Sequence, residues 1–107
     1  MFKINARPTF TIDVPIALEG MAEPMVLKTT FRAISDEEAL THDFNSAEGF
    51  KAFLREVVVE MHDLVDDDDA PVSYSDAIRD RLLGWQHIRL GLQRAYWTAL
   101  TKARLGN

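Results

Sequence analysis

The stretch PTFTIDVPIA, residues 8–17, decides the fold class because every second residue in it is apolar. A period of two with several β-branched residues predicts a β-strand that buries one face. Pro15 has no N–H to give to a neighbouring strand, so we expect this strand to lie at an edge of its sheet or to end there. The apolar positions are Phe10, Ile12, Val14 and Ile16.

A second strand is predicted over residues 25–34, after a turn over residues 19–24 that contains Gly20 and Pro24. Its alternation places apolar side chains on one face and Lys28, Thr30 and Arg32 on the other, as in an antiparallel pair with one wet face. A two-stranded hairpin is marginal alone in water. Residues 1–34 therefore predict a hairpin whose apolar face needs helices or another chain to cover it.

Helices are predicted next, over the acidic residues 35–65. Ser35 with Glu38 forms a capping-box pattern that opens a short helix ending near His42. Asn45 with Glu48 three residues later opens a second helix over residues 45–64. Steps of three and four between its apolar residues predict one buried stripe. The stripe contains Phe50, Phe53, Leu54, Val57, Val58, Met61 and Leu64.

Residues 66–72 contain four consecutive aspartates followed by Ala70 and Pro71, and we expect an acidic loop there. Adjacent carboxylates repel one another, are unfavourable at a helix C-terminus, and precede a residue that stops helices. Carboxylates also attract hard cations. However, a calcium loop requires alternating acids, a glycine and a closing glutamate, none of which this run has.

The C-terminal residues 73–105 predict two more helices. Ser73 with Asp76 offers another capping box, and Gly84-Trp85 predicts a break. The last helix is expected from Gln86 or His87 to about residue 103. Together these elements predict an α+β fold in a single domain over residues 1–107, with an N-terminal antiparallel hairpin packed on a bundle of three to four helices.

Composition and motifs favour a non-catalytic protein without a cofactor or metal. Cysteine is absent, no run is long enough to span a membrane, and no leader sequence is recognisable. The three histidines, His42, His62 and His87, lie apart and form no zinc-type pair. No phosphate loop, dinucleotide fingerprint or nucleophile elbow occurs. We therefore expect neither an enzyme nor a small-molecule substrate.

The net charge of −5 hides a strong segregation along the chain. Residues 1–34 carry +1, residues 35–80 carry −11, and residues 81–107 carry +5 with no acidic residue. The simpler interpretation is that the acidic middle and the basic tail neutralise each other within one domain. Binding of the basic tail to nucleic acid is disfavoured because the whole chain is acidic and would repel phosphates.

The last helix has more apolar circumference than one core-facing stripe requires, and Gly91 leaves room for another backbone to approach closely. One interpretation is a central helix packed on both sides. The other is an interface with a partner or a second copy, where aromatics and arginine are enriched. The candidate interface residues are Trp85, Leu92, Arg94, Tyr96, Trp97 and Leu100.

The order of two strands, an acidic helical middle and this tail resembles the tail assembly chaperones of long-tailed, siphovirus-type bacteriophages. The motifs that carry the resemblance are YSDAIRDRLLGW at residues 74–85 and LQRAYWTAL at residues 92–100. At the break, this chain has Trp85-Gln86-His87 where that family often has Ile-Pro-Gly. The resemblance spans nearly the whole chain.

The resemblance implies a protein of the cytoplasm of an infected or lysogenic bacterium that is absent from the mature virion. Such a protein binds the tape-measure protein, recruits tail-tube subunits and can form homo-oligomers. A different hypothesis follows from residues 35–80, whose charge of −11 is also typical of an inhibitor that mimics nucleic acid and blocks a basic host protein. A carrier or enzyme-subunit role has no support from particular residues.

Overall fold

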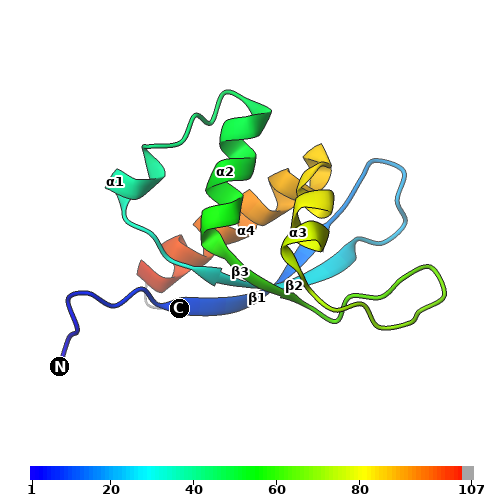
Figure 1. Ribbon diagram of the computed structural model, residues 1–107, viewed down its shortest axis with the longest axis horizontal. Coiled ribbons are helices and arrows are strands. Elements are labelled where there is room, and N and C mark those ends of the chain that lie inside the picture. The colour runs from blue at the N-terminus through cyan, green and yellow to red at the C-terminus, as the bar shows by residue number, and fades with distance from the viewer. Residues whose placement is uncertain (105–107) are drawn as a thin grey trace.

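The computed structural model describes residues 1–104, and the side chains of residues 1–102. These residues form a three-stranded antiparallel sheet and four helices, which confirms the predicted α+β class. Figure 1 shows the helices gathered on one side of the sheet. The elements are β1 (Thr9–Ile16), β2 (Met25–Arg32), α1 (Asp36–Ala39), α2 (Ala47–Val57), β3 (Val58–His62), α3 (Asp76–Leu83) and α4 (Gln86–Arg104).

The predicted hairpin is confirmed by the pairing of β1 with β2 along their whole length, from Thr9 opposite Arg32 to Ile16 opposite Met25. The strand order is β1-β2-β3, so β1 lies at an edge, as Pro15 predicts. Four of the alternating apolar residues of the two strands are buried, with Val14 and Phe31 wholly inaccessible. The buried members are Val14, Ile16, Leu27 and Phe31.

The third strand corrects the sequence prediction, because the helix expected over residues 45–64 ends at Val57. Val58 opens β3 directly, and β3 pairs antiparallel with β2 from Lys28 opposite His62 to Phe31 opposite Val58. Consecutive valines at 57–59 favour extended structure. In addition, β3 satisfies backbone groups along the second edge of β2, a need that the periodicity of one segment does not reveal.

Serine side chains cap the N-termini of α1, α2 and α3. Ser35 and Glu38 form the predicted capping box of α1. The cap of α2 is Ser46, not Asn45, and its hydroxyl accepts the Gly49 N–H at 3.0 Å. Gly49 has a packing reason that the sequence does not show: a Cβ there would collide with the backbone carbonyl of Asp43.

The predicted C-terminal break is confirmed, because α3 ends at Leu83 and α4 begins at Gln86. The cap of α3 is Ser75, whose hydroxyl accepts the Ile78 N–H, two residues after the Ser73 cap that the sequence predicts. Ser75 therefore caps the start of α3, and Gly84 is the residue at which the helix ends.

The core is one cluster of buried residues in which Tyr96 has a central place. Its ring lies 5.0–5.9 Å, centroid to centroid, from the rings of Phe10, Phe31, Phe53 and Trp97. Its hydroxyl accepts the Ile34 N–H at 3.1 Å, at the point where the chain leaves β2. Tyr96 thus ties α4 to the end of the hairpin through both packing and a hydrogen bond.

Candidate functional site

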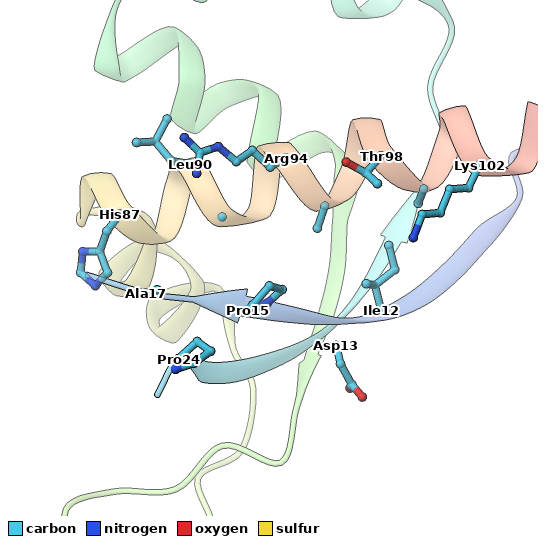
Figure 2. A pocket seen from close by; sticks show the side chains of 13 residues that line it. Ile12, Asp13, Pro15, Ala17, Pro24, His87, Leu90, Arg94, Thr98 and Lys102 are labelled. Carbon is cyan, nitrogen blue, oxygen red and sulfur yellow. The ribbon is translucent and has the colours of Figure 1, made fainter. Parts of the chain in front are cut away.

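An open groove of about 830 Å³ runs between β1 and α4. Figure 2 shows it, with α4 along one side and β1 along the other. Its volume is within the range of ligand-binding pockets, and its lining is mostly apolar. The α4 side is formed by His87, Leu90, Gly91, Arg94, Ala95, Thr98, Ala99 and Lys102. The opposite side is formed by Ile12, Asp13, Pro15, Ala17 and Pro24.

The groove follows from the spacing of residues along α4. Its lining residues recur in steps of three and four, so they occupy one continuous face of the helix. Leu92 and Tyr96 project from a neighbouring face into the core. One face of α4 therefore holds the helix on the sheet, while the next face remains open.

Gly91 sets how close α4 lies to β1. A Cβ added there would lie 2.6 Å from the Ile16 Cδ1 atom and 3.2 Å from the Pro15 carbonyl oxygen. The sequence predicts a close backbone approach at Gly91, and the structure shows that the nearby backbone is β1 of the same chain. At this contact, helix and strand meet within the lining of the groove.

Basic side chains from α4 border the groove. Arg94 and Lys102 are exposed there, with His87 at the same helix face. In Figure 2 the Lys102 side chain extends from α4 toward β1. Asp13 is the one acidic residue in the lining, and Figure 2 shows its carboxylate pointing away from α4. The groove is consequently basic in a protein whose net charge is negative.

The basic tail does not pair with the acidic middle in the part of the chain whose side chains are described. No ion pair there joins a carboxylate to Arg81, Arg89, Arg94 or Lys102. Arg89 donates instead to the Leu83 carbonyl oxygen at 2.9 Å. Direct neutralisation by ion pairs, the simpler interpretation of the charge segregation, is therefore absent among these residues.

The structure separates the six predicted interface residues. Leu92 and Tyr96 have no exposed surface, so the prediction that they form an interface is wrong: they are core residues. Trp97 and Leu100 are half-buried against the same core. Trp85 is 60% exposed but lies outside the groove lining. Arg94 alone of the six lines the groove.

The sequence prediction missed the other groove residues on α4, including Ala95, Thr98 and Ala99. Their regular spacing is present in the sequence, but small residues alone do not indicate an interface. Which face of α4 packs against the sheet is decided by contacts with distant strands, so the open face could not be chosen from the helix sequence alone.

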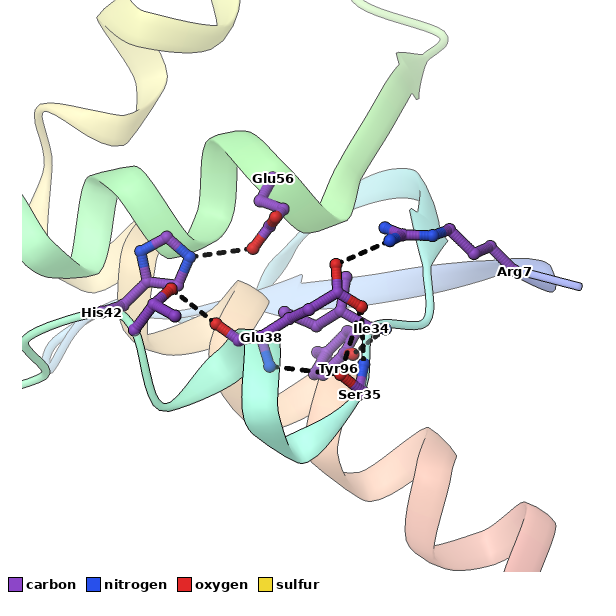
Figure 3. Close-up of polar contacts among 8 residues, drawn as sticks. Arg7, Ile34, Ser35, Glu38, His42, Glu56 and Tyr96 are labelled. Carbon is purple, nitrogen blue, oxygen red and sulfur yellow. Dashed lines mark hydrogen bonds and ion pairs between the residues drawn. The ribbon is translucent and has the colours of Figure 1, made fainter. Parts of the chain in front are cut away.

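Polar contacts elsewhere have structural roles. Figure 3 shows the cluster around α1, in which Arg7 pairs with Glu38 at 2.8 Å and His42 pairs with Glu56 at 2.8 Å. The pKa of Glu38 is below its ordinary value. The largest cause is the hydrogen bond that the Ser35 backbone N–H donates to the Glu38 carboxylate, and the Ser35 hydroxyl and Arg7 make smaller contributions. These contacts fasten α1 and its flanking chain to the sheet and α2.

A second polar row crosses the open face of the sheet. The Thr30 hydroxyl lies 2.7 Å from the Thr11 hydroxyl on one side and 2.7 Å from His62 Nε2 on the other. Such a row is an ordinary cross-strand ladder. Residues 1–104 contain no group of three or more His, Asp or Glu residues that could hold a metal ion.

The predicted acidic loop is confirmed, and its first aspartate has a structural role. The Asp66 carboxylate accepts the N–H groups of Asp68 and Ala70 at 2.8 and 3.0 Å, which closes the turn. A bridge between Val65 and Pro71 joins its ends. All four aspartates are exposed, so the loop presents a concentrated negative charge to solvent.

Comparison with models of known protein families, with curated proteins and with solved structures finds no match for this chain. Among residues 1–104, no helix combines the length and the apolar character that crossing a membrane requires.

Proposed function

We propose that this protein is a non-catalytic tail assembly chaperone of a long-tailed bacteriophage, acting in the cytoplasm of the bacterial host. It binds the tape-measure protein, keeps that long helical chain soluble, and recruits tail-tube subunits. The observation that carries the proposal is the apolar groove between β1 and α4, which the described residues leave uncovered. The sequence resemblance at residues 74–85 and 92–100 supports the same conclusion.

The groove supports a chaperone role because it is an open surface with a mostly apolar lining, not an enclosed cavity. An open apolar surface can accept a segment of another protein and release it again without unfolding either partner. Chaperoning requires such displaceable contacts, whereas catalysis requires a shaped and partly dry pocket.

The charge distribution supports the role in a second way. Residues 35–80 carry a net charge of −11 with many exposed carboxylates, and this negative charge keeps a protein with an open apolar surface from associating indiscriminately. The basic border of the groove is the exception, and it directs a partner to that side of the molecule.

Co-expression with the tape-measure protein encoded in the same gene cluster tests the proposal. We expect a larger soluble fraction of the tape-measure protein and co-elution of the two proteins in size-exclusion chromatography. The matched control is an unrelated acidic protein of similar size and charge. No gain in solubility together with no co-elution would refute the proposal.

The exposed acidic loop supports a second candidate, an inhibitor that mimics nucleic acid and occupies a basic host protein. None of its four carboxylates, those of Asp66, Asp67, Asp68 and Asp69, makes an ion pair among the described residues. Binding of that kind weakens steeply with salt, because charges more than about 3 Å apart are screened at about 1 M. Persistent binding to the basic partner at that salt concentration would count against this candidate.

A further inference from the structure

We infer that the groove between β1 and α4 binds one amphipathic α-helix of a partner protein, whose apolar stripe is flanked by acidic residues. The inference rests on the proposed function, in which the partner is the helical tape-measure protein, and it names the binding surface and the chemistry that this surface recognises. Size, charge and backbone geometry each support a helix of this kind.

The length of the groove fits about four helical turns. The lining of α4 runs from His87 to Lys102, which at 1.5 Å per residue is about 22 Å. Two of the central positions, Ala95 and Ala99, are small, so a second helix can approach α4 closely there, whereas Gly91 is already in contact with β1. A partner helix would present anchors at positions i, i+3, i+4 and i+7, as in other helix-in-groove complexes.

The charge of the groove favours acidic flanks on that helix. Arg94 and Lys102 stand at the border and form no ion pair in the part of the chain whose side chains are described. An acidic partner is attracted here and repelled by the carboxylate-rich remainder of the surface. Charge complementarity of this kind sets orientation and specificity more than total affinity.

Backbone geometry favours a helix over an added β-strand. The Ala33 N–H donates to the Pro8 carbonyl at 2.9 Å, so alternate residues from Pro8 onward bond to β2 and the residues between them point to the free edge. Where β1 itself lines the groove, those edge residues are Asp13 and Pro15, and Pro15 has no N–H. A strand would find one donor there, whereas a helix satisfies its own backbone groups.

The helices of a second copy are poor occupants. The apolar face of α2 is already buried in the core through Phe53, Leu54 and Val57. The helix α1 is only four residues long, α3 is only eight residues long and buries Leu83 in the core, and α4 contains no acidic residue. A partner of different sequence therefore fits the groove better than another molecule of this chain.

A designed peptide probe tests the inference with the full-length protein. The probe is a fluorescein-labelled helical peptide of about 20 residues, with Leu and Ala every third and fourth position and Glu on both flanks. Two companion peptides replace Glu by Lys, or scramble the order so that no apolar stripe remains. We expect fluorescence anisotropy to show binding of the Glu peptide and about tenfold weaker binding of both companions.

Variants locate the site. Arg94→Glu with Lys102→Glu should weaken binding of the Glu peptide about tenfold and create binding of the Lys peptide. The matched control, Lys3→Glu with Arg81→Glu, makes the same change in net charge outside the groove and should leave binding of the Glu peptide within about twofold. Thr98→Trp fills the open groove from an exposed position and should abolish binding while the circular dichroism spectrum stays unchanged.

Several results would overturn the inference. The first is equal binding of the Glu peptide and the scrambled peptide, and the second is undiminished binding of the Glu peptide by the Thr98→Trp variant. The third is a light-scattering mass that shows an oligomer for the free wild-type protein and a monomer for Thr98→Trp. The last result would assign the groove to a second copy.

Failure of the inference is distinguishable from failure of the proposed function. If the tape-measure protein binds the wild type and the groove variants equally, the function stands and the site is elsewhere. If the Glu peptide binds in the groove but the tape-measure protein does not bind at all, the groove stands and the proposed partner is wrong.

Discussion

Replacing Tyr96 by phenylalanine removes one hydroxyl from the centre of the core and tests whether this residue is structural. The Tyr96 hydroxyl accepts the Ile34 N–H at 3.1 Å, and its ring is fully buried among four other aromatic rings. The Tyr96→Phe variant keeps the ring and loses only the hydrogen bond. The Tyr96→Ala variant loses the ring as well.

The expected magnitudes follow from these contacts. Loss of one hydrogen bond to a half-buried N–H costs about 1 kcal/mol of unfolding free energy, which lowers the melting temperature by about 4–6 °C in a domain of this size. Loss of a fully buried aromatic ring costs about 3–5 kcal/mol. Such a loss is a large part of the about 5–15 kcal/mol that stabilises an ordinary domain.

Urea denaturation followed by far-ultraviolet circular dichroism measures both values. The matched control is Trp85→Phe, which changes an exposed ring and should alter the unfolding free energy by less than about 0.5 kcal/mol. If Tyr96→Phe is as stable as the wild type and Tyr96→Ala loses less than about 1 kcal/mol, Tyr96 is not the core residue described above.

The same variant predicts a difference at alkaline pH. Burial raises the pKa of Tyr96 above its ordinary value of 10.0, so folding favours the neutral phenol. The resulting stabilisation is complete below about pH 10 and is lost as the pH rises through the folded-state pKa. Burial also raises the pKa of Tyr74, so the wild type and Tyr96→Phe should both lose stability above pH 10, with the larger loss in the wild type.

Three further predictions concern local contacts. Ser35→Ala should cost about 1 kcal/mol at pH 7, because the N-cap of α1 is lost. Since the pKa of Glu38 is lowered, its stabilisation is present above its ordinary pKa of 4.5 and is lost as the pH falls through the lower folded-state value. Ser35→Ala removes only the hydroxyl contact, because the contacts of the Ser35 backbone N–H and Arg7 remain. Urea midpoints at pH 7 and pH 3 should therefore differ slightly less in Ser35→Ala than in the wild type. Gly49→Ala should cost about 1–3 kcal/mol in thermal denaturation, because the new methyl group collides with the Asp43 carbonyl, and an unchanged melting temperature would contradict this packing. Thr29→Val should change the unfolding free energy by less than about 1 kcal/mol, since its buried hydroxyl donates only to a local carbonyl two residues earlier; a loss above about 2 kcal/mol would show that this bond matters more.

The amino-acid sequence by itself determined the features that depend on neighbouring residues. Alternation over residues 8–17 and 25–34 predicted the hairpin, Pro15 predicted its edge position, and Ser35 with Glu38 predicted the first helix cap. These predictions succeeded because a strand period, a missing N–H and a capping hydroxyl act within a few residues of the chain.

Only the tertiary structure decided what depends on distant partners. Residues 58–62 became β3 because β2 has a second edge to pair, although the same residues continue a helical apolar stripe. Tyr96 lies in the core and Arg94 lines the groove, because contacts with β1 and β2 set the rotation of α4 about its own axis. Pairing of strands and rotation of a helix about its axis are set by residues far away in the sequence, and for that reason the open groove could be found only in the folded chain.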